Sequence, residues 1–286
     1  MSGRASGDQR VFDALAATFL ALSTVIQASP PGTGSARIGR SRGGLAREAD
    51  CAWACGPVAL PDVNRVLVPR LAGRPAAVED RIAAINANFG DLPFSWWLDP
   101  AATPEDLAET LGWVAARTTV DLVPVMALRL DARDWGSLGR PSGVSVALAE
   151  TSDALVAAEL VGARGFEVAD EVAEPFASMF EGVTAPPDGP LIVTVASLDG
   201  RPAATALGIV HGPDLGIYNV ATIPEARRRG LGRAAMGGVL AEGLRRGART
   251  ALLESSEEGV GLYRSLGFDE AGLALVVTIP GGSSAR

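Results

Sequence analysis

The chain passes from an apolar strand into a long, proline-free helix at Asn219-Val220-Ala221-Thr222-Ile223-Pro224-Glu225-Ala226-Arg227-Arg228-Arg229-Gly230-Leu231-Gly232-Arg233. Backbone N–H groups at such a helix start point into one concavity, and the helix dipole adds positive charge there, so the turn is an anion site. Gly230 and Gly232 leave room for a bulky anion to approach the backbone. Further positive charge comes from Arg227, Arg228, Arg229 and Arg233. The expected guest is a pyrophosphate.

The composition limits what the rest of the chain can be. Its 286 residues are 48% hydrophobic and 20% charged, which predicts globular structure and suffices for two modest domains. The formal net charge of -8 argues against a nucleic-acid binder, because phosphate backbones need basic faces. An acidic surface weakly favours a cationic or amine-bearing partner, although plain solubility explains it equally well.

The two cysteines, Cys51 and Cys55, are spaced like a metal-binding pair. A zinc site needs about four ligands, and the single histidine, His211, lies far away in the sequence. We therefore expect no metal and two buried thiols in a reducing cytoplasm.

The run from Val11 to Gln27 is rich in alanine and leucine and is followed by small residues, as in a signal peptide. The interpretation we favour is an amphipathic first helix, because Phe12, Leu15, Phe19 and Leu22 recur at helical spacing. We expect no run that is long and apolar enough to span a bilayer, and no membrane partner.

Periodicity and turn residues divide the chain into residues 1–131, a Gly/Pro-rich linker at 132–143 and residues 144–286. In the first part we expect helices at 11–27, 75–89 and 103–116, a mobile loop at 30–47, and strands at 52–55, 63–68, 93–98 and 122–130. In the second part we expect helices at 151–160, 171–180 with Pro175 in the first turn, 229–246 and 257–265. Its expected strands are 144–149, 191–196, 203–210, 215–223, 250–254 and 271–279.

Two motifs together resemble the GNAT acyltransferase superfamily. Arg227-Arg228-Arg229-Gly230-Leu231-Gly232 matches its Arg/Gln-x-x-Gly-x-Gly/Ala signature between a strand and a helix. About thirty residues on, Ser256-x-x-Gly259-x-x-x-Tyr263-x-x-Leu266-Gly267-Phe268 is similar to its second motif. The resemblance covers Val144 to Ile279.

The resemblance implies an α/β (α+β) fold of tandem GNAT-like domains, each a mixed, mostly antiparallel twisted sheet flanked by helices. The corresponding stretch of the first half, Val66 to Arg74, has no Arg-x-x-Gly-x-Gly. We therefore interpret residues 1–131 as a degenerate GNAT-like domain and 144–286 as the acetyltransferase domain.

The resemblance also implies acetyl-CoA as the donor. The amides of the Arg227–Arg233 loop would bind its pyrophosphate, and the pantetheine arm would lie like an extra strand along the backbone of Val220, Ala221 and Thr222. Ser256 stands where many relatives have an asparagine that reaches this arm. A helix cap is an equally good interpretation of this serine.

For catalysis, Tyr263 occupies the family's general-acid position, where its hydroxyl would face the CoA sulfur. Glu254 ends the strand beside the expected pantetheine slot and is our candidate for the general base. A water chain without a dedicated base is a competing possibility. One of Trp96 and Trp97 could line an acceptor pocket between the halves, although core packing of both is the simpler interpretation.

These features predict an N-acetyltransferase that moves acetyl from acetyl-CoA to a small-molecule or peptide amine by direct attack. The alternative is a CoA-binding sensor with little turnover, which the intact Tyr263 argues against. The sequence does not name the amine, and it leaves a homodimer open.

Overall fold

The computed structural model describes residues 5–28, 44–99, 119–138 and 140–282. The first half contributes strands β1 (Gly44–Arg47), β2 (Ala52–Cys55), β3 (Arg65–Leu67), β4 (Phe94–Leu98) and β5 (Thr119–Arg129). The second half contributes β6 (Val144–Leu148), β7 (Leu191–Leu198), β8 (Arg201–His211), β9 (Asp214–Thr222), β10 (Thr250–Glu254) and β11 (Asp269–Ile279). These strands form one mixed, 11-stranded sheet in the order β1-β2-β3-β4-β11-β5-β10-β9-β8-β7-β6.

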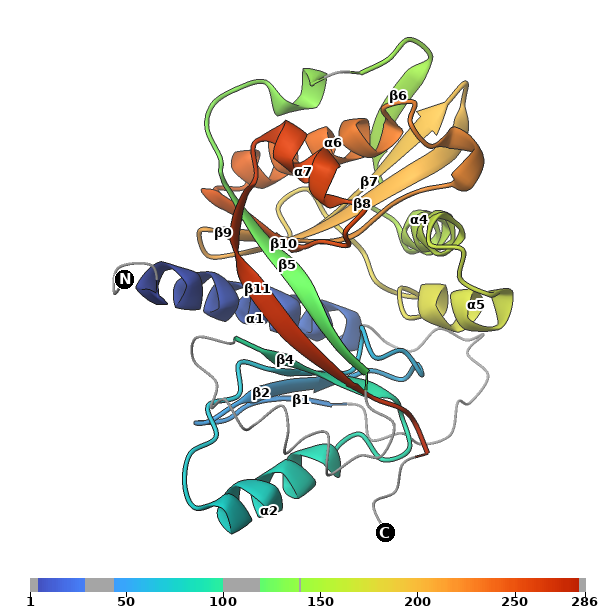
Figure 1. Cartoon of the computed structure of the whole chain (residues 1–286). Coiled ribbons are helices and arrows are strands. Elements are labelled where there is room, and N and C mark those ends of the chain that lie inside the picture. The colour runs from blue at the N-terminus through green and yellow to red at the C-terminus, as the bar shows by residue number, and fades with distance from the viewer. Residues whose placement is uncertain (1–4, 29–43, 100–118, 139, 283–286) are drawn as a thin grey trace.

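The two halves of the chain exchange strands in this sheet. β5, from the first half, lies between β10 and β11 and is antiparallel to both. β11, the last strand, continues beyond the second half and pairs with β4. The two long strands therefore form an arch that joins the halves (Figure 1). The expected division at residues 132–143 follows the chain, but the sheet itself runs across it.

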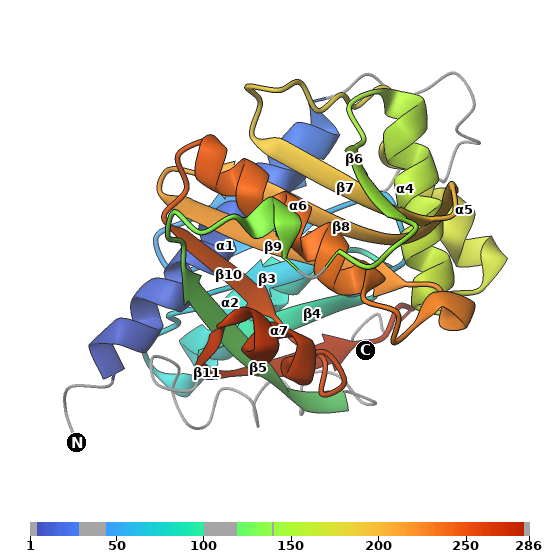
Figure 2. The same ribbon diagram turned by 90° about the horizontal axis from the view of Figure 1, so that it is seen from above.

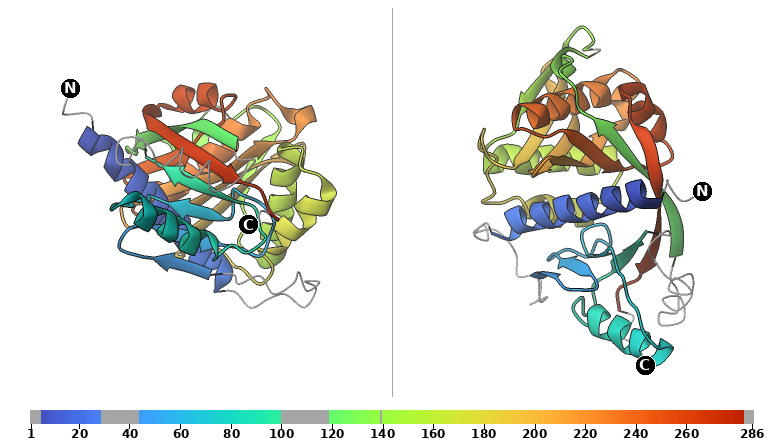
Figure 3. Two further views of the ribbon diagram at one scale, coloured as in Figure 1. Left: turned by 60° about the horizontal axis from the view of Figure 1, so that its bottom comes forward. Right: turned by 90° about the vertical axis from the view of Figure 1, so that its left-hand side faces the viewer.

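Six helices and two 3₁₀ turns cover the sheet in the described residues. The helices are α1 (Ala5–Gln27), α2 (Pro75–Asn86), α4 (Ser152–Gly165), α5 (Asp170–Ser178), α6 (Leu231–Arg245) and α7 (Val260–Leu266), and the 3₁₀ turns are η1 (Trp135–Ser137) and η2 (Pro224–Ala226). α6 and α7 cover one face of the second-half strands (Figure 2). α1 passes between the second-half strands and the first-half strands, with α4 and α5 beside it (Figures 1 and 3).

The amphipathic interpretation of the first helix is confirmed. Phe12, Leu15, Phe19 and Leu22 are all buried, in clusters shared with strands of both halves. By length and composition alone, however, Gln9–Gln27 is apolar enough to cross a membrane. The expectation that no run reaches this limit was therefore wrong, because the few polar residues of this helix barely lower its mean hydropathy.

Other expected elements differ in detail. β1 occupies residues 44–47, within the stretch expected to be a mobile loop. It forms a hairpin with β2 across residues 48–51, but its four residues, Gly-Leu-Ala-Arg, carry little strand propensity. Pro175 lies inside α5 rather than in its first turn, since the helix already begins at Asp170. The acids Asp170 and Glu171 suit that earlier start at the positive end of the helix dipole. The helix expected at 103–116 lies outside the described residues.

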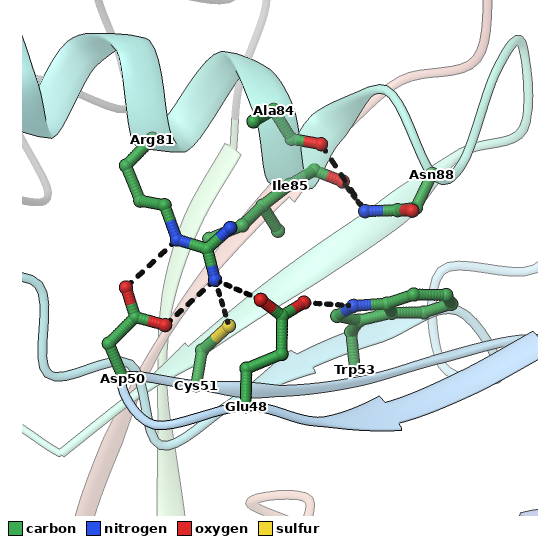
Figure 4. Close-up of polar contacts among 8 residues, drawn as sticks. All are labelled: Glu48, Asp50, Cys51, Trp53, Arg81, Ala84, Ile85 and Asn88. Atoms are coloured by element: carbon green, nitrogen blue, oxygen red, sulfur yellow. Dashed lines mark hydrogen bonds and ion pairs between the residues drawn. The ribbon is translucent and has the colours of Figure 1, made fainter.

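A polar cluster fixes α2 to the first-half strands (Figure 4). Arg81 makes two hydrogen bonds with the Asp50 carboxylate, each 2.8 Å long, and a third with Glu48 at 2.5 Å. Trp53 donates its indole N–H to the same Glu48. Beneath them Cys51 is a free, buried thiol, as is Cys55, and burial raises the pKa of Cys55 to about 11. No group of three or more potential metal ligands occurs among the described residues.

We predict that Arg81→Met lowers the free energy of unfolding by about 1 kcal/mol at neutral pH, because it removes a bidentate but partly exposed network. Hydrogen bonds from Trp53 and Arg81 hold the pKa of Glu48 below its ordinary value, and Arg81 does the same for Asp50. This stabilisation is present above the ordinary carboxyl pKa of about 4 and is lost below it. The measurement is urea unfolding at neutral and acid pH, with Arg74→Met as the control. If the loss in free energy of unfolding caused by Arg81→Met is the same at both pH values, the prediction is contradicted.

Candidate functional site

A split between two parallel strands organises the site. β9 pairs with β10 from Asp214–Thr250 to Ile217–Leu253, and the pairing ends there. β9 continues to Thr222, with a register shift against β8 and a left-handed Asn219 at φ 52°. Such a bulge bends a strand locally. Beyond Ile217, β9 therefore presents a backbone edge that no strand in the described part of the chain covers.

The loop after β9 presents free amides at the start of α6. Arg228 and Gly230 are left-handed, at φ 59° and 80°, so the chain turns sharply into the helix. The first amide to bond back into the helix is that of Ala234, which donates to Gly230. For the amides of residues 228–233 no acceptor is found within the described residues. The predicted anion site is thus geometrically available, as a helix N-terminus with exposed donors.

The four arginines of the loop differ in what they contact. Arg227 donates to the carbonyls of Thr222 and Gly165, at 3.3 and 2.8 Å, and so ties the end of β9 to α4. Arg233 donates to Ser265 and ties α6 to α7. Arg228 and Arg229 are exposed and make no hydrogen bond or ion pair with another side chain or carbonyl in the described part of the chain, so their charge is free for an anion. That any of the four binds a cofactor stays a prediction.

The two predicted residues of the second motif lie on or beside α7. Tyr263 is buried edge-on against Phe268, with ring centroids 5.9 Å apart, and burial raises the pKa of Tyr263 to about 12. No hydrogen bond of its hydroxyl to another described residue is found. Ser256 uses its hydroxyl locally, since it accepts from the Gly259 amide at 3.2 Å. The bond closes the turn that leads into α7, whose own N-cap is Gly259 without a side-chain capping bond, so Ser256 supports the approach to the helix rather than its N-cap.

Glu254 ends β10 at the split and is engaged by a residue from the other half. The Arg65 guanidinium, on β3, donates to Glu254 Oε2 at 2.6 Å, and the two side chains are only 8% and 14% exposed. Arg65 itself lies over the rings of Phe19 and Trp97, at 4.4 and 4.1 Å. No motif singles out Arg65, which is a lone arginine in a short apolar strand.

A cavity of about 410 Å³ lies on the α1 and α4 side of the split. Its lining is mainly apolar and comes from α1, α4, α5 and the loop at residues 56–65. Its polar walls include Arg65, Glu159, Asn219 and Glu254. Trp96 and Trp97 do not line it; both are buried in the core, so the hypothesis that one faces an acceptor pocket is not supported here.

Glu159, on α4, was missed by the sequence analysis and lies beside the bulge. It is 1% exposed; Asn219 Nδ2 donates to its Oε2, while its Oε1 has no partner within the described residues. Burial raises the pKa of Glu159 to about 8. Small residues bring α4 this close: a Cβ at Gly162 would lie 3.0 Å from the Asn219 amide nitrogen, and one at Gly165 would lie 2.7 Å from Ala221.

Part of this chain is similar to known acetyltransferases. Residues 159–268 match the model of the Acetyltransferase (GNAT) family. Over 76 residues, or 26% of the chain, it is 38% identical to the [Ribosomal protein bS18]-alanine N-acetyltransferase of Escherichia coli K12. The corresponding Salmonella typhimurium enzyme is 40% identical over the same length. The chain spans about half of each relative, 51% of its length.

Solved structures share the fold over most of the chain. A GCN5-related N-acetyltransferase from Kribbella flavida superposes with a TM-score of 0.62 at 24% identity, covering 87% of this chain and 93% of that one. A tandem GNAT protein from the clavulanic acid biosynthesis pathway superposes with a TM-score of 0.54 at 18% identity, and the alignment covers 97% of each chain. The expected tandem GNAT fold is thereby confirmed.

We predict that Arg65→Met destabilises the protein by about 3 kcal/mol, because it leaves the Glu254 carboxylate half-buried without its cation. Adding Glu254→Gln should recover much of this loss, since the stranded charge disappears. Arg70→Met is the matched control, as its ion pair with Asp13 is exposed at 42% and 41% and should contribute less than about 1 kcal/mol. Denaturant unfolding is measured for the wild type, Arg65→Met, Glu254→Gln, their double variant and Arg70→Met. If the loss in the double variant equals the sum of the two single losses, the two side chains are not coupled.

Proposed function

We propose that the chain, whose residues 159–268 match the GNAT acetyltransferase family model, transfers the acetyl group of acetyl-CoA to an amine. One observation carries the proposal: the uncovered edge of β9 leads from free amides at the start of α6 to a cavity lined by Glu159 and Glu254. A donor held along this edge and an acceptor held in the cavity would meet at the split.

The donor side fits acetyl-CoA in shape and charge. The amides of residues 228–233 would receive the pyrophosphate, with Arg228 and Arg229 adding positive charge. The backbone of Val220, Ala221 and Thr222 would pair with the pantetheine amides, as in the addition of a strand. Acetyl-CoA supplies an activated thioester when it is bound.

The chain's own groups would then carry the chemistry. Backbone amides at the bulge of β9, beside the split, would stabilise negative charge that develops on the acetyl oxygen. Tyr263, with its pKa raised to about 12, stays protonated at neutral pH and would give its proton to the leaving sulfur. Glu254 remains a candidate base, but its engagement by Arg65 favours a role in positioning. We place this activity in the cytoplasm, where the free thiols Cys51 and Cys55 suit a reducing environment.

We predict that Gly232→Val weakens acetyl-CoA binding about tenfold or more, because the loss of one or two hydrogen bonds to the guest is of that size. A Cβ at Gly232 would already lie 3.1 Å from Thr222 Oγ1 and 3.7 Å from Leu262, so a larger side chain fills the slot between β9 and α7. Gly261→Val is the matched control, since nothing lies within 4 Å of a Cβ at that position. Titration calorimetry measures the acetyl-CoA affinity of both variants. Equal affinities would show that the slot between β9 and α7 is not part of the donor site.

We predict that Tyr263→Phe lowers kcat about 100-fold, which is typical for the loss of a general acid, while acetyl-CoA affinity changes less than about twofold. The substitution keeps the ring against Phe268 and removes only the hydroxyl. The measurement is acceptor-dependent thiol release, paired with calorimetry on the same preparation. Unchanged turnover would exclude Tyr263 as the acid.

A further inference from the structure

We propose that the cavity beside the β9 bulge takes a primary amine carried on an apolar body, and that Glu159 receives the proton which the ammonium loses before attack. The inference rests on the proposed acetyl transfer and names the acceptor class and the base for it.

The lining separates an apolar body from a polar end. The cavity's volume of about 410 Å³ suits a small ligand rather than a folded partner. Apolar side chains from three separate parts of the chain surround most of it, including Leu22, Ile26, Leu60, Val63, Phe176 and Met179. The carboxylate of Glu159 is held by Asn219 of β9, and Glu254 ends β10, so both line the cavity next to the place where these strands part. An amine with an apolar tail would therefore place its nitrogen at the split.

One oxygen of the Glu159 carboxylate has no hydrogen-bond donor among the described residues, so a ligand could supply one. One carboxyl oxygen is held by the Asn219 side chain, and the other faces no donor within the described residues although it is buried. A buried polar atom without a partner costs free energy, and a ligand donor would satisfy it. Asn219 belongs to the uncovered part of β9, so the carboxylate is held beside the strand along which the thioester would lie.

Glu254 is less suited to the same task. Its Oε2 is bound to the guanidinium of Arg65, and Arg65 is fixed between two aromatic rings. Protonation of Glu254 would leave the buried guanidinium of Arg65 without its counter-charge. Glu159 has no cationic partner among the described residues, so it gains a proton without breaking an ion pair.

The proton balance follows from these placements. The ammonium gives one proton to the Glu159 carboxylate, and the freed lone pair forms the N–C bond to the acetyl carbon. The C–S bond breaks, Tyr263 protonates the sulfur, and the nitrogen loses its second proton to solvent. Glu159 then releases its proton and Tyr263 regains one, so each turnover releases one proton in total.

The surroundings of Glu159 set the pH dependence. Burial raises the pKa of Glu159 to about 8, and the Asn219 hydrogen bond opposes the rise. β8 faces α4 with the neutral Thr205, and β7 brings no titratable group. The titratable groups of the cavity and of α5 are Asp62, Arg65, Tyr218, Glu254, Asp170, Glu171 and Glu174. Because the carboxylate must be ionised to accept a proton, kcat/KM should rise as the pH passes about 8.

The first test is an amine panel with purified protein and acetyl-CoA: 2-phenylethylamine, hexylamine, spermidine and a short peptide with N-terminal alanine. The apolar amines should exceed the other two in kcat/KM by about tenfold or more, because a cavity lined mostly by carbon favours them. A preference for spermidine or for the peptide would overturn the acceptor class. If no amine is turned over, the proposed function fails, and calorimetry with 2-phenylethylamine then tests the cavity alone.

Two variants test where the amine lies. Leu60→Trp places an indole at the cavity wall, whereas Ala59→Trp places it on the exposed neighbour outside. Leu60→Trp should raise the KM for 2-phenylethylamine, or its Kd where there is no turnover, about tenfold, and Ala59→Trp less than about twofold. Acetyl-CoA affinity should be the same in both. Equal amine binding in the two variants would overturn the assignment of the cavity.

Glu159→Gln tests the base, with the exposed Glu174→Gln as the matched control. We expect Glu159→Gln to lower kcat/KM about 100-fold, to abolish the rise near pH 8, and to leave acetyl-CoA affinity unchanged. A retained rise near pH 8 would overturn the role of Glu159, even in a fully active acetyltransferase.

Thermal unfolding gives a readout of Glu159 that does not depend on activity. Its pKa is raised in the folded protein, so the folded state binds the proton more tightly than the unfolded chain. The Tm of the wild type should therefore fall between about pH 5 and 8, and Glu159→Gln should flatten this fall while Glu174→Gln keeps it. Identical pH profiles in all three proteins would show that Glu159 is not the buried titrating group.

Discussion

The parting of β9 from β10 is the constraint on which the site depends. Two parallel strands that stayed paired to their ends would close the sheet, and no backbone edge would remain for a donor. Here the bulge at Asn219 turns β9 aside after Ile217, and the loop that follows delivers unbonded amides at the start of α6. The same bend brings the Asn219 side chain against α4, where it contacts Glu159. One local irregularity therefore shapes the donor edge and one wall of the cavity.

The exchange of strands keeps that irregularity in place. β5 covers the far edge of β10, and β11 runs from β5 to β4, so the split cannot widen without loss of pairing between the halves. α1 is packed between the two sets of strands and supplies Phe19 beneath Arg65. Closing a sheet through distant segments is entropically costly, and the buried apolar face of α1 offsets that cost.

Local chemistry made part of this structure predictable. The glycines and arginines around residue 230 require a left-handed turn into a helix, and the structure has that turn at Arg228 and Gly230. Strand alternation, in contrast, tells which face a residue occupies and not which strand lies beside it, so the place of β5 between β10 and β11 could not be inferred. Glu159 resembled any glutamate on an amphipathic helix. Its burial results from the close approach of α4 to β9 at Gly162 and Gly165, which is a tertiary property.

The first half has no anion loop of its own, yet the second half would be incomplete without it. Val66 to Arg74 has a single glycine, Gly73, and Pro75 stands where the second glycine of the Arg227–Arg233 loop would be. What this half provides instead is Arg65 against Glu254, the cavity wall at residues 56–65, and α1. A guanidinium that neutralises Glu254 leaves Glu159 as the carboxyl without a cation at the split. The two halves therefore contribute different parts of the site. The second half has the geometry to hold a donor, and the first half shapes the space into which an acceptor must fit.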